Sequence, residues 1–282
     1  MRRILIILLF INATCLCAQP ISTSDSLIVK PNQKRLIAIG VGATALYSGT
    51  LIGLNELWYK QNEKSSFHFF NDNDEWLQLD KFGHAYTAYN QSVFGIKAMK
   101  WAGLPHKKAV LYGSLAGIVF QTPIEILDGY SSAWGFSWGD MIANTVGAAS
   151  AFTQFYFWDE AKIKWKYSFL RSGLASERPN VLGRGLNEQI IKDYNSHTYW
   201  LSFDANSFIS SKIPKWLNVA VGYGGHGLVH ARREVNEANG YDAYRQYYVA
   251  LDLDLSSIET KRKGLKFLFW LLDCYHLPLP AV

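Results

Sequence analysis

The feature that most constrains the fold is an uncharged segment from Leu36 to Leu54, which follows Lys34 and Arg35 and ends just before Glu56. A helix of this length is just sufficient to span a bilayer. Its small residues would allow close contact with neighbouring helices. A buried helix of a soluble bundle is the competing interpretation, because an apolar run of this kind fits both environments.

The N-terminus has the pattern of an export signal. Arg2 and Arg3 precede an apolar run from Ile4 to Ile11, and small residues follow up to Ala18. We therefore predict a signal peptide over residues 1–18 and a mature chain that begins near Gln19. The expected location is the bacterial cell envelope, in association with a membrane, without a choice between the inner and the outer one.

The cysteines leave one alternative open at this end. Cys15 or Cys17 could be lipidated, although the residues before them lack the apolar residue that usually precedes a lipidated cysteine. Removal of the signal leaves Cys274 as the remaining thiol, so an intramolecular disulfide is excluded in the mature chain. Burial of apolar surface in a core or in lipid must then provide the stability.

Composition favours a membrane or an interface over a nucleic acid. Aromatic residues make up 15% of the chain and charged residues 18%, and the net charge of +5 comes from scattered residues. A chain that binds nucleic acid would gather its basic residues in a patch. The partner that we expect is a membrane lipid or another envelope component; protein partners are not indicated.

The first part of the chain predicts a mainly helical fold. After a linker at residues 19–33, a module at residues 34–160 has about four helices, which makes it a membrane-associated helical bundle. Besides the first segment, we expect helices over residues 76–101, 106–127 and 138–158.

A β-rich segment is expected over residues 161–282. Residues 168–214 are typical of irregular structure, with residues 198–208 as a weaker strand candidate. Side chains then alternate with period two in residues 216–225 and 247–258, which is typical of half-buried strands in a small antiparallel sheet. A short helix is expected over residues 264–277.

Three pairs of polar residues stand out in the helical module. Asp80 and His84 are four residues apart, and so are Asp140 and Asn144, while Glu125 and Asp128 are three apart. These spacings place both members of a pair on one helix face. We predict that Asp80, His84, Glu125 and Asp140 converge at one polar pocket, because separate unpaired carboxylates would each be costly to bury.

A cluster of carboxylates and one imidazole could bind a divalent metal ion. The four converging residues would then be the hypothetical metal ligands and, in an enzyme, the catalytic residues, since a metal lowers the pKa of a bound water. Lys81, Asp128, Ser137 and Asn144 would support the cluster.

Each of these residues also has a purely structural interpretation. Thr122 with Glu125, and Ser137 with Asp140, match capping boxes at helix starts. Asp128 could end a helix before Gly129, His84 could be a core histidine, and Lys81 could neutralise a neighbouring carboxylate.

Other motifs are weaker. His226 and His230 have the spacing of metal ligands, but the surrounding glycines favour a loop, and the sequence contains neither a GxSxG nor an HExxH motif.

The motifs DKFGH, EILDG and GFSWGDMIANTVGA, between Trp76 and Ala151, resemble the YfiM-like family of uncharacterised bacterial envelope lipoproteins. Their order is also loosely similar to that in VanZ-like membrane proteins. The resemblance implies a helical envelope protein and carries over to the following positions: Asp80, Lys81, His84, Glu125, Asp128, Gly129, Ser137, Asp140, Asn144 and Gly147.

The function expected from the sequence is a structural or binding role in the envelope. The alternative is a metal-dependent hydrolase that acts on a lipid or cell-wall fragment, with Lys81 holding a phosphate or carboxylate. The sequence does not say whether the chain is an enzyme.

Overall fold

The computed structural model describes residues 30–277 and residue 281. The predicted signal peptide and most of the predicted linker lie outside the described residues. The described chain is helical up to residue 157 and continues into an antiparallel sheet, which agrees with the predicted order of a helical part and a β-rich part.

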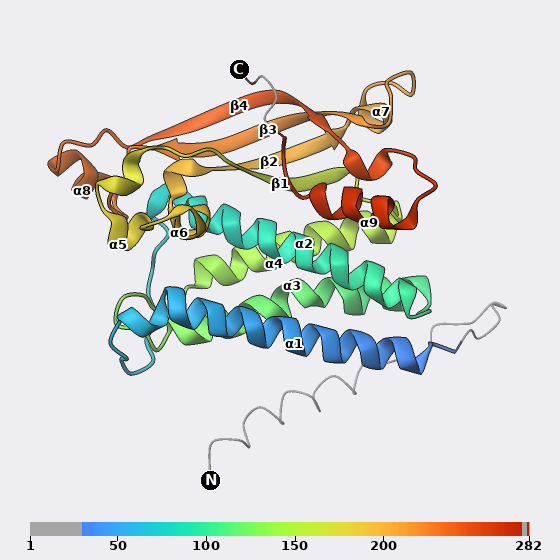
Figure 1. Cartoon of the computed structure of the whole chain (residues 1–282), viewed down its shortest axis with the longest axis horizontal. Coiled ribbons are helices and arrows are strands. Elements are labelled where there is room, and N and C mark those ends of the chain that lie inside the picture. The colour runs from blue at the N-terminus through green and yellow to red at the C-terminus, as the bar shows by residue number, and fades with distance from the viewer. Residues whose placement is uncertain (1–29, 278–280, 282) are drawn as a thin grey trace, which may run out of the picture. The chain divides into compact units, whose positions relative to one another are not determined.

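Four long helices form the first part: α1 (Gln33–Leu57), α2 (Leu79–Trp101), α3 (His106–Asp128) and α4 (Trp138–Phe157). Figure 1 shows the sheet on the α2 side of these helices and α1 on the opposite side. Single-turn 3₁₀ helices lie at Tyr59–Gln61 and Trp76–Gln78.

Two of the four helices, α1 and α3, are long and apolar enough to cross a membrane. Within their most apolar windows, α1 has no buried residue, and 33% of the residues of α3 are buried.

Glycines allow α2, α3 and α4 to pack closely. A Cβ atom at Gly113 of α3 would lie 2.3 Å from the backbone nitrogen of Ile96 in α2, and one at Gly147 of α4 would lie 2.1 Å from the carbonyl oxygen of Ala85. Both distances are too short for any side chain. These two glycines therefore set how near the polar residues on the three helices can come to one another.

The sheet has the order β1–β2–β3–β4, and each strand is antiparallel to the next. The strands are β1 (Ile163–Phe169), β2 (His197–Asp204), β3 (Leu217–His226) and β4 (Tyr244–Leu253). Short elements join or follow them: α5 (Pro179–Leu182), α6 (Leu186–Lys192), α7 (Ala205–Phe208), α8 (Arg233–Ala238), α9 (Lys263–Leu272) and 3₁₀ turns at Leu174–Ser176, Tyr194–Ser196 and Leu255–Ser257.

The expectation of irregular structure up to Pro214 was wrong. The helices α5 and α6 lie in that segment, and strand β1, which was not predicted, ends at its start. The alternation of Ile163, Trp165, Tyr167 and Phe169 with polar residues was the available signal for β1.

One buried cluster joins the helices to the sheet. Leu77 and Leu79, just before and at the start of α2, pack with Tyr167 of β1, Tyr199 of β2 and Leu228. A second buried cluster lies among α2, α3 and α4 and includes Tyr89, Val93, Ile96, Val110, Ala151 and Phe155. The sheet therefore packs directly on the start of α2.

The start of α2 differs from the prediction. The helix begins at Leu79 rather than near Trp76, because Trp76, Leu77 and Gln78 have φ angles of 49°, 50° and 63°. Non-glycine residues rarely adopt this left-handed conformation, which requires support from surrounding structure. The support comes from the sheet. The hydroxyl of Tyr223 donates to the carbonyl oxygen of Leu77 at 2.5 Å, and Arg245 donates to Oε1 of Gln78 at 2.8 Å.

Candidate functional site

The predicted site residues meet at one end of the helical layer. Helices α2 and α4 begin at the end where α3 finishes, so Asp80 and His84 of α2 lie beside Glu125 of α3 and Asp140 of α4. Glu125, Asp140 and Asn144 are buried, and Asp80 and His84 are partly buried. The structure thus brings all four predicted residues together, and their chemical role stays a prediction.

Lys81 is the cationic centre of this cluster. Its ammonium lies 2.6 Å from Oδ1 of Asp72, 2.9 Å from Oδ2 of Asp80 and 2.8 Å from Oδ1 of Asp140. One lysine therefore neutralises part of the charge of three carboxylates, which matches the structural interpretation of Lys81 from the sequence.

His84 lies on the other side of Asp140. Its Nδ1 is 3.2 Å from Oδ1 of Asn144 and 3.5 Å from Oε1 of Glu125, and its Nε2 is 3.7 Å from Oδ1 of Asp140. If Nδ1 carries the proton and donates to Asn144, then Nε2 presents its lone pair towards Asp140. The predicted pair of Asp140 and Asn144 thus positions the imidazole from one helix face.

Asp128 lies apart from this group. Its Oδ1 accepts a hydrogen bond of 2.8 Å from the hydroxyl of Tyr59, which follows α1. Asp128 therefore ties the end of α3 to the end of α1, and its predicted supporting role is a structural one.

Ser137 caps the start of α4, as one capping-box interpretation predicted, but its own N–H faces Glu125 and not the Asp140 carboxylate that would complete such a box. Its Oγ accepts from the backbone N–H of Asp140 at 3.1 Å and donates to Oδ1 of Asp72 at 2.6 Å. Its own N–H lies 3.4 Å from Oε2 of Glu125. The other capping-box interpretation was wrong. Thr122 lies inside α3, where its hydroxyl donates to the carbonyl oxygen of Ile118.

Asp72 is a member of the site that the sequence analysis missed. It lies in the polar loop before α2, without a partner at helical spacing. The available signal was the run of Asn and Asp residues at 71–74, which the sequence analysis did not use.

Several buried acceptors of the cluster have no hydrogen bond. They are Oδ1 of Asp80, Oε1 of Glu125 and Oδ1 of Asp140. The side-chain amide nitrogen of Asn144 is a buried donor that also lacks a hydrogen bond. Oδ1 of Asp140 is in ion-pair contact with Lys81 but outside hydrogen-bond geometry. Buried polar groups are normally paired, so each of these atoms calls for an explanation.

The pKa values of Asp80, Lys81 and His84 are raised at the start of α2, where carboxylates outnumber basic groups. Burial raises the pKa of Asp80 to about 6 from its ordinary value of 3.8, against the opposing effect of Lys81. Burial alone would lower the pKa of His84, but the carboxylates of Asp140, Glu125 and Asp80 together raise it. Burial would likewise lower the pKa of Lys81, and its carboxylate neighbours raise it instead. The cluster therefore favours bound protons or other cations.

Two sets of residues have the geometry of a metal site. The first set is His84, Glu125 and Asp140, and the second is Asp72, Asp80 and Asp140. In each set, every residue offers one ligand atom, and these three atoms lie within 4.8 Å of one another. The second set already surrounds the ammonium of Lys81. The first set is the better candidate, because two of its three residues offer carboxylate oxygens that lack a hydrogen bond.

Residues 68–156 match a family described as "Predicted periplasmic lipoprotein (DUF2279)". The matched segment contains all the site residues and leaves α1 and the sheet outside. The similarity supports an exported, envelope-associated protein of an uncharacterised lipoprotein family. The narrower resemblances to YfiM-like and VanZ-like proteins stay predictions. No curated protein and no solved structure matches the chain.

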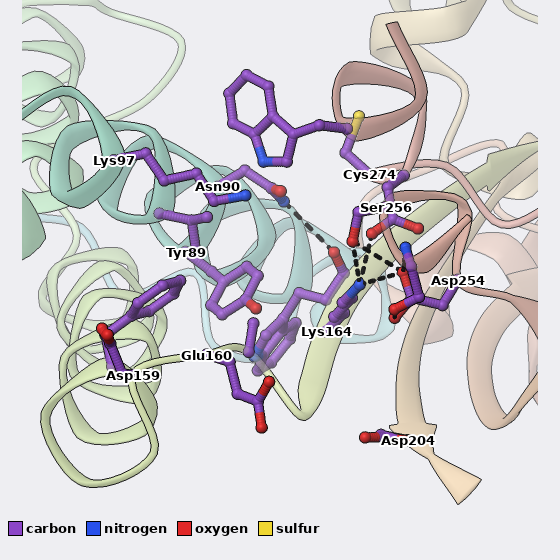
Figure 2. Close-up of a pocket in the computed structure, with 17 residues that line it drawn as sticks. Tyr89, Asn90, Lys97, Asp159, Glu160, Lys164, Asp204, Asp254, Ser256 and Cys274 are labelled. Atoms are coloured by element: carbon purple, nitrogen blue, oxygen red, sulfur yellow. Dashed lines mark hydrogen bonds and ion pairs between the residues drawn. The ribbon is translucent and has the colours of Figure 1, made fainter. Parts of the chain in front are cut away.

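A second polar centre lies beneath the sheet and lines a cavity of about 290 Å³ (Figure 2). The ammonium of Lys164 lies 2.5 Å from Asp254, 2.8 Å from Ser256 and 2.7 Å from Asp273. Three acceptors for three N–H groups leave this lysine fully engaged. No spacing in the sequence indicates this centre, because its residues come from distant segments.

The other histidine pair forms no metal site. Among residues 30–277 and 281, His226 and His230 belong to no group of three potential metal ligands, and Nδ1 of His230 lies 3.1 Å from Arg178. The expectation of a loop was wrong in part: Gly222, Gly224, Gly225 and His226 belong to strand β3, and the chain leaves the sheet after His226.

Proposed function

We propose that this chain is an exported, membrane-associated envelope protein that binds one divalent metal ion through His84, Glu125 and Asp140. The observation that carries the proposal is the convergence of three potential ligand atoms within 4.8 Å, with Oε1 of Glu125 and Oδ1 of Asp140 lacking hydrogen bonds. A bound cation would satisfy both oxygens and offset their negative charge.

The donor set suits a borderline or hard divalent ion. One imidazole and two carboxylates are typical ligands of zinc or manganese rather than of a soft metal ion. Asn144 would fix the orientation of the His84 ring, and Lys81 and Ser137 would orient the two carboxylates, as outer partners of metal ligands usually do.

Membrane association is supported by the surface of α1. Ile37, Val41, Leu46 and Ile52 are each more than 60% exposed along this helix. Each such side chain contributes about 1.5–3 kcal/mol when it leaves water, so a lipid environment would stabilise the helix.

A metal-dependent hydrolase that acts on a lipid or cell-wall fragment is the second candidate. Two observations favour it. Three protein ligands are the usual number in catalytic zinc sites, which keep a further position open. In addition, the side chain of His84 is 21% exposed, so the cluster is not sealed from solvent.

Metal analysis of the purified full chain tests the proposal. We expect about one equivalent of zinc or manganese in the parent protein, and a dissociation constant that is at least about tenfold larger after Glu125→Gln. Asp128→Asn is the matched control, because Asp128 lies one turn further along α3 and bonds to Tyr59 instead.

Absence of stoichiometric metal, together with an unchanged melting temperature when zinc or manganese is added, would contradict the metal proposal. The carboxylates would then be hydrogen-bonding and capping groups. Membrane association is tested separately: after carbonate washing, the chain should stay with the membrane pellet.

A further inference from the structure

Helix α9 exposes a large part of its apolar surface. Although most of its side chains are apolar, none of its residues is buried. Phe267 is 57% exposed, Leu268 45% and Leu271 50%. Burial is the main source of stability for an amphipathic helix, so a short helix of this kind needs a further apolar environment.

The side of α9 that carries Trp270 is held on α2, and the Trp270 ring also contacts Phe267 at the edge of the exposed face, with the ring centroids 5.7 Å apart. The ring of Trp270 lies 5.8 Å from Phe94 in a stacked arrangement, and the ammonium of Lys97 lies 4.7 Å from the same Trp270 ring. Figure 1 shows α9 next to the C-terminal half of α2. These contacts anchor the helix and leave its apolar face pointing away from the chain.

Basic residues lie just before α9 and in its first turn. Lys261, Arg262, Lys263 and Lys266 are exposed, and no ion pair of these four is found within the described ranges 30–277 and 281. Glu259 is the one acidic residue near them in the sequence before the helix. Asp273, just after the helix, is bound to Lys164 and Lys166 and does not offset this charge.

We propose that α9 inserts its apolar face into a membrane surface that contains anionic lipids, with the four basic residues at the headgroups. An apolar face flanked by lysine and arginine is the arrangement of helices that lie in the membrane interface. Basic residues near an anionic surface are attracted to it, which adds to the effect of burying the apolar face. This contact lies outside the segment similar to the lipoprotein family, and it adds a second attachment to the membrane association proposed above.

Hydroxyl-radical footprinting of the unmodified full chain tests the proposal. The chain is placed in nanodiscs of phosphatidylglycerol with phosphatidylethanolamine, and in nanodiscs of phosphatidylcholine alone. We expect the oxidation rates of Phe267, Leu268 and Leu271 to be at least about fivefold lower in the anionic nanodiscs. Leu186 on α6, which is 50% exposed, is the internal control and should keep its rate.

A variant with Lys261, Arg262, Lys263 and Lys266 all replaced by Gln should lose this protection and still pellet with membranes. Equal rates in both lipids, or protection that survives in the variant, would overturn the proposal. Protection that disappears on dilution of the protein would also overturn it, since a second copy would then cover α9. Failure of carbonate-resistant pelleting concerns α1 instead, so the two results are distinguishable.

Discussion

The molecule contains two buried charge clusters, and they differ in balance. Under the sheet, Lys164 and Lys166 bind three aspartates: Asp252, Asp254 and Asp273. At the helix ends, four carboxyl groups surround one lysine and one histidine: Asp72, Asp80, Glu125 and Asp140 with Lys81 and His84.

The difference in balance suggests different roles. Each lysine under the sheet has three oxygen partners, because Lys166 also reaches the carbonyl oxygen of Leu253 at 2.8 Å. This cluster leaves one buried carboxylate oxygen, Oδ1 of Asp252, without a hydrogen bond. The helical cluster leaves three, on Asp80, Glu125 and Asp140, and has a larger excess of carboxylates over lysines, so it is the place where a further cation would be stabilised more.

The largest effect should follow from Lys166→Met. This side chain is fully buried, and its loss leaves Asp252 and Asp273 without their shared partner, which should cost about 3–5 kcal/mol of unfolding free energy. Denaturant unfolding in detergent measures this loss. Lys162→Met is the control, because Lys162 forms a surface ion pair with the exposed Glu160 and otherwise lies over the ring of Trp158. A loss below about 1 kcal/mol would mean that the sheet cluster is not structural.

Lys81→Met should have a smaller effect that metal ions reverse. The cluster is partly open to solvent, so we expect a loss of about 2–3 kcal/mol without added metal. Zinc or manganese should raise the stability of the parent and of Lys166→Met by the same RT ln(1 + [L]/Kd), because the proposed site is intact in both proteins. The ions should raise the stability of Lys81→Met by more, because its site lacks the competing ammonium and binds the ion more tightly. If both variants respond alike to the ions, the distinction between the clusters is wrong.

Asp80→Asn should change how stability depends on pH. The folded pKa of Asp80 is raised to about 6 from an ordinary value of 3.8. The carboxyl group thus contributes stability that is present below pH 3.8 and is lost as the pH rises through about 6. The variant should lack this decline, a difference of up to about 2 kcal/mol. Thermal unfolding of both proteins from pH 4 to pH 7 measures it, and parallel curves would contradict the raised pKa.

Ser137→Ala should give the smallest effect, a loss of about 1 kcal/mol, which is usual for an N-cap. The hydroxyl caps α4 and also bonds to Asp72, so the variant should weaken metal binding only slightly. Thr145→Ala, at an exposed position of α4, is the control for helix propensity. A loss of metal equal to that in Glu125→Gln would instead make Ser137 part of the binding site.

Much of the helical cluster could be predicted from the sequence. The spacing of Asp80 with His84 and of Asp140 with Asn144 fixes which side chains share a helix face. The convergence of these faces was inferred from the cost of burying separate charges, and the structure confirms that the faces converge. Asp72 could not be found this way, because a loop residue has no periodicity that aims its side chain.

In the sheet, periodicity is not sufficient to predict which face of a strand is buried. Alternation in β4 separates Tyr247, Val249 and Leu251 from Ala250 and Asp252. An apolar face normally packs inward, yet here Asp252 is fully buried and the three apolar residues are more than 50% exposed. Period two identifies the two faces of a strand and does not say which one is covered.

The sequence by itself determined the elements: the four long helices, three of the four strands and the residues that share each helix face. These follow from local periodicity and spacing. Tertiary structure decided the rest. Lys166 makes the polar face of β4 the buried one, and Tyr223 and Arg245 hold the left-handed turn before α2. The physical reason is that partners distant in the chain provide the free energy for a buried charge or a strained turn, and a local pattern does not contain them.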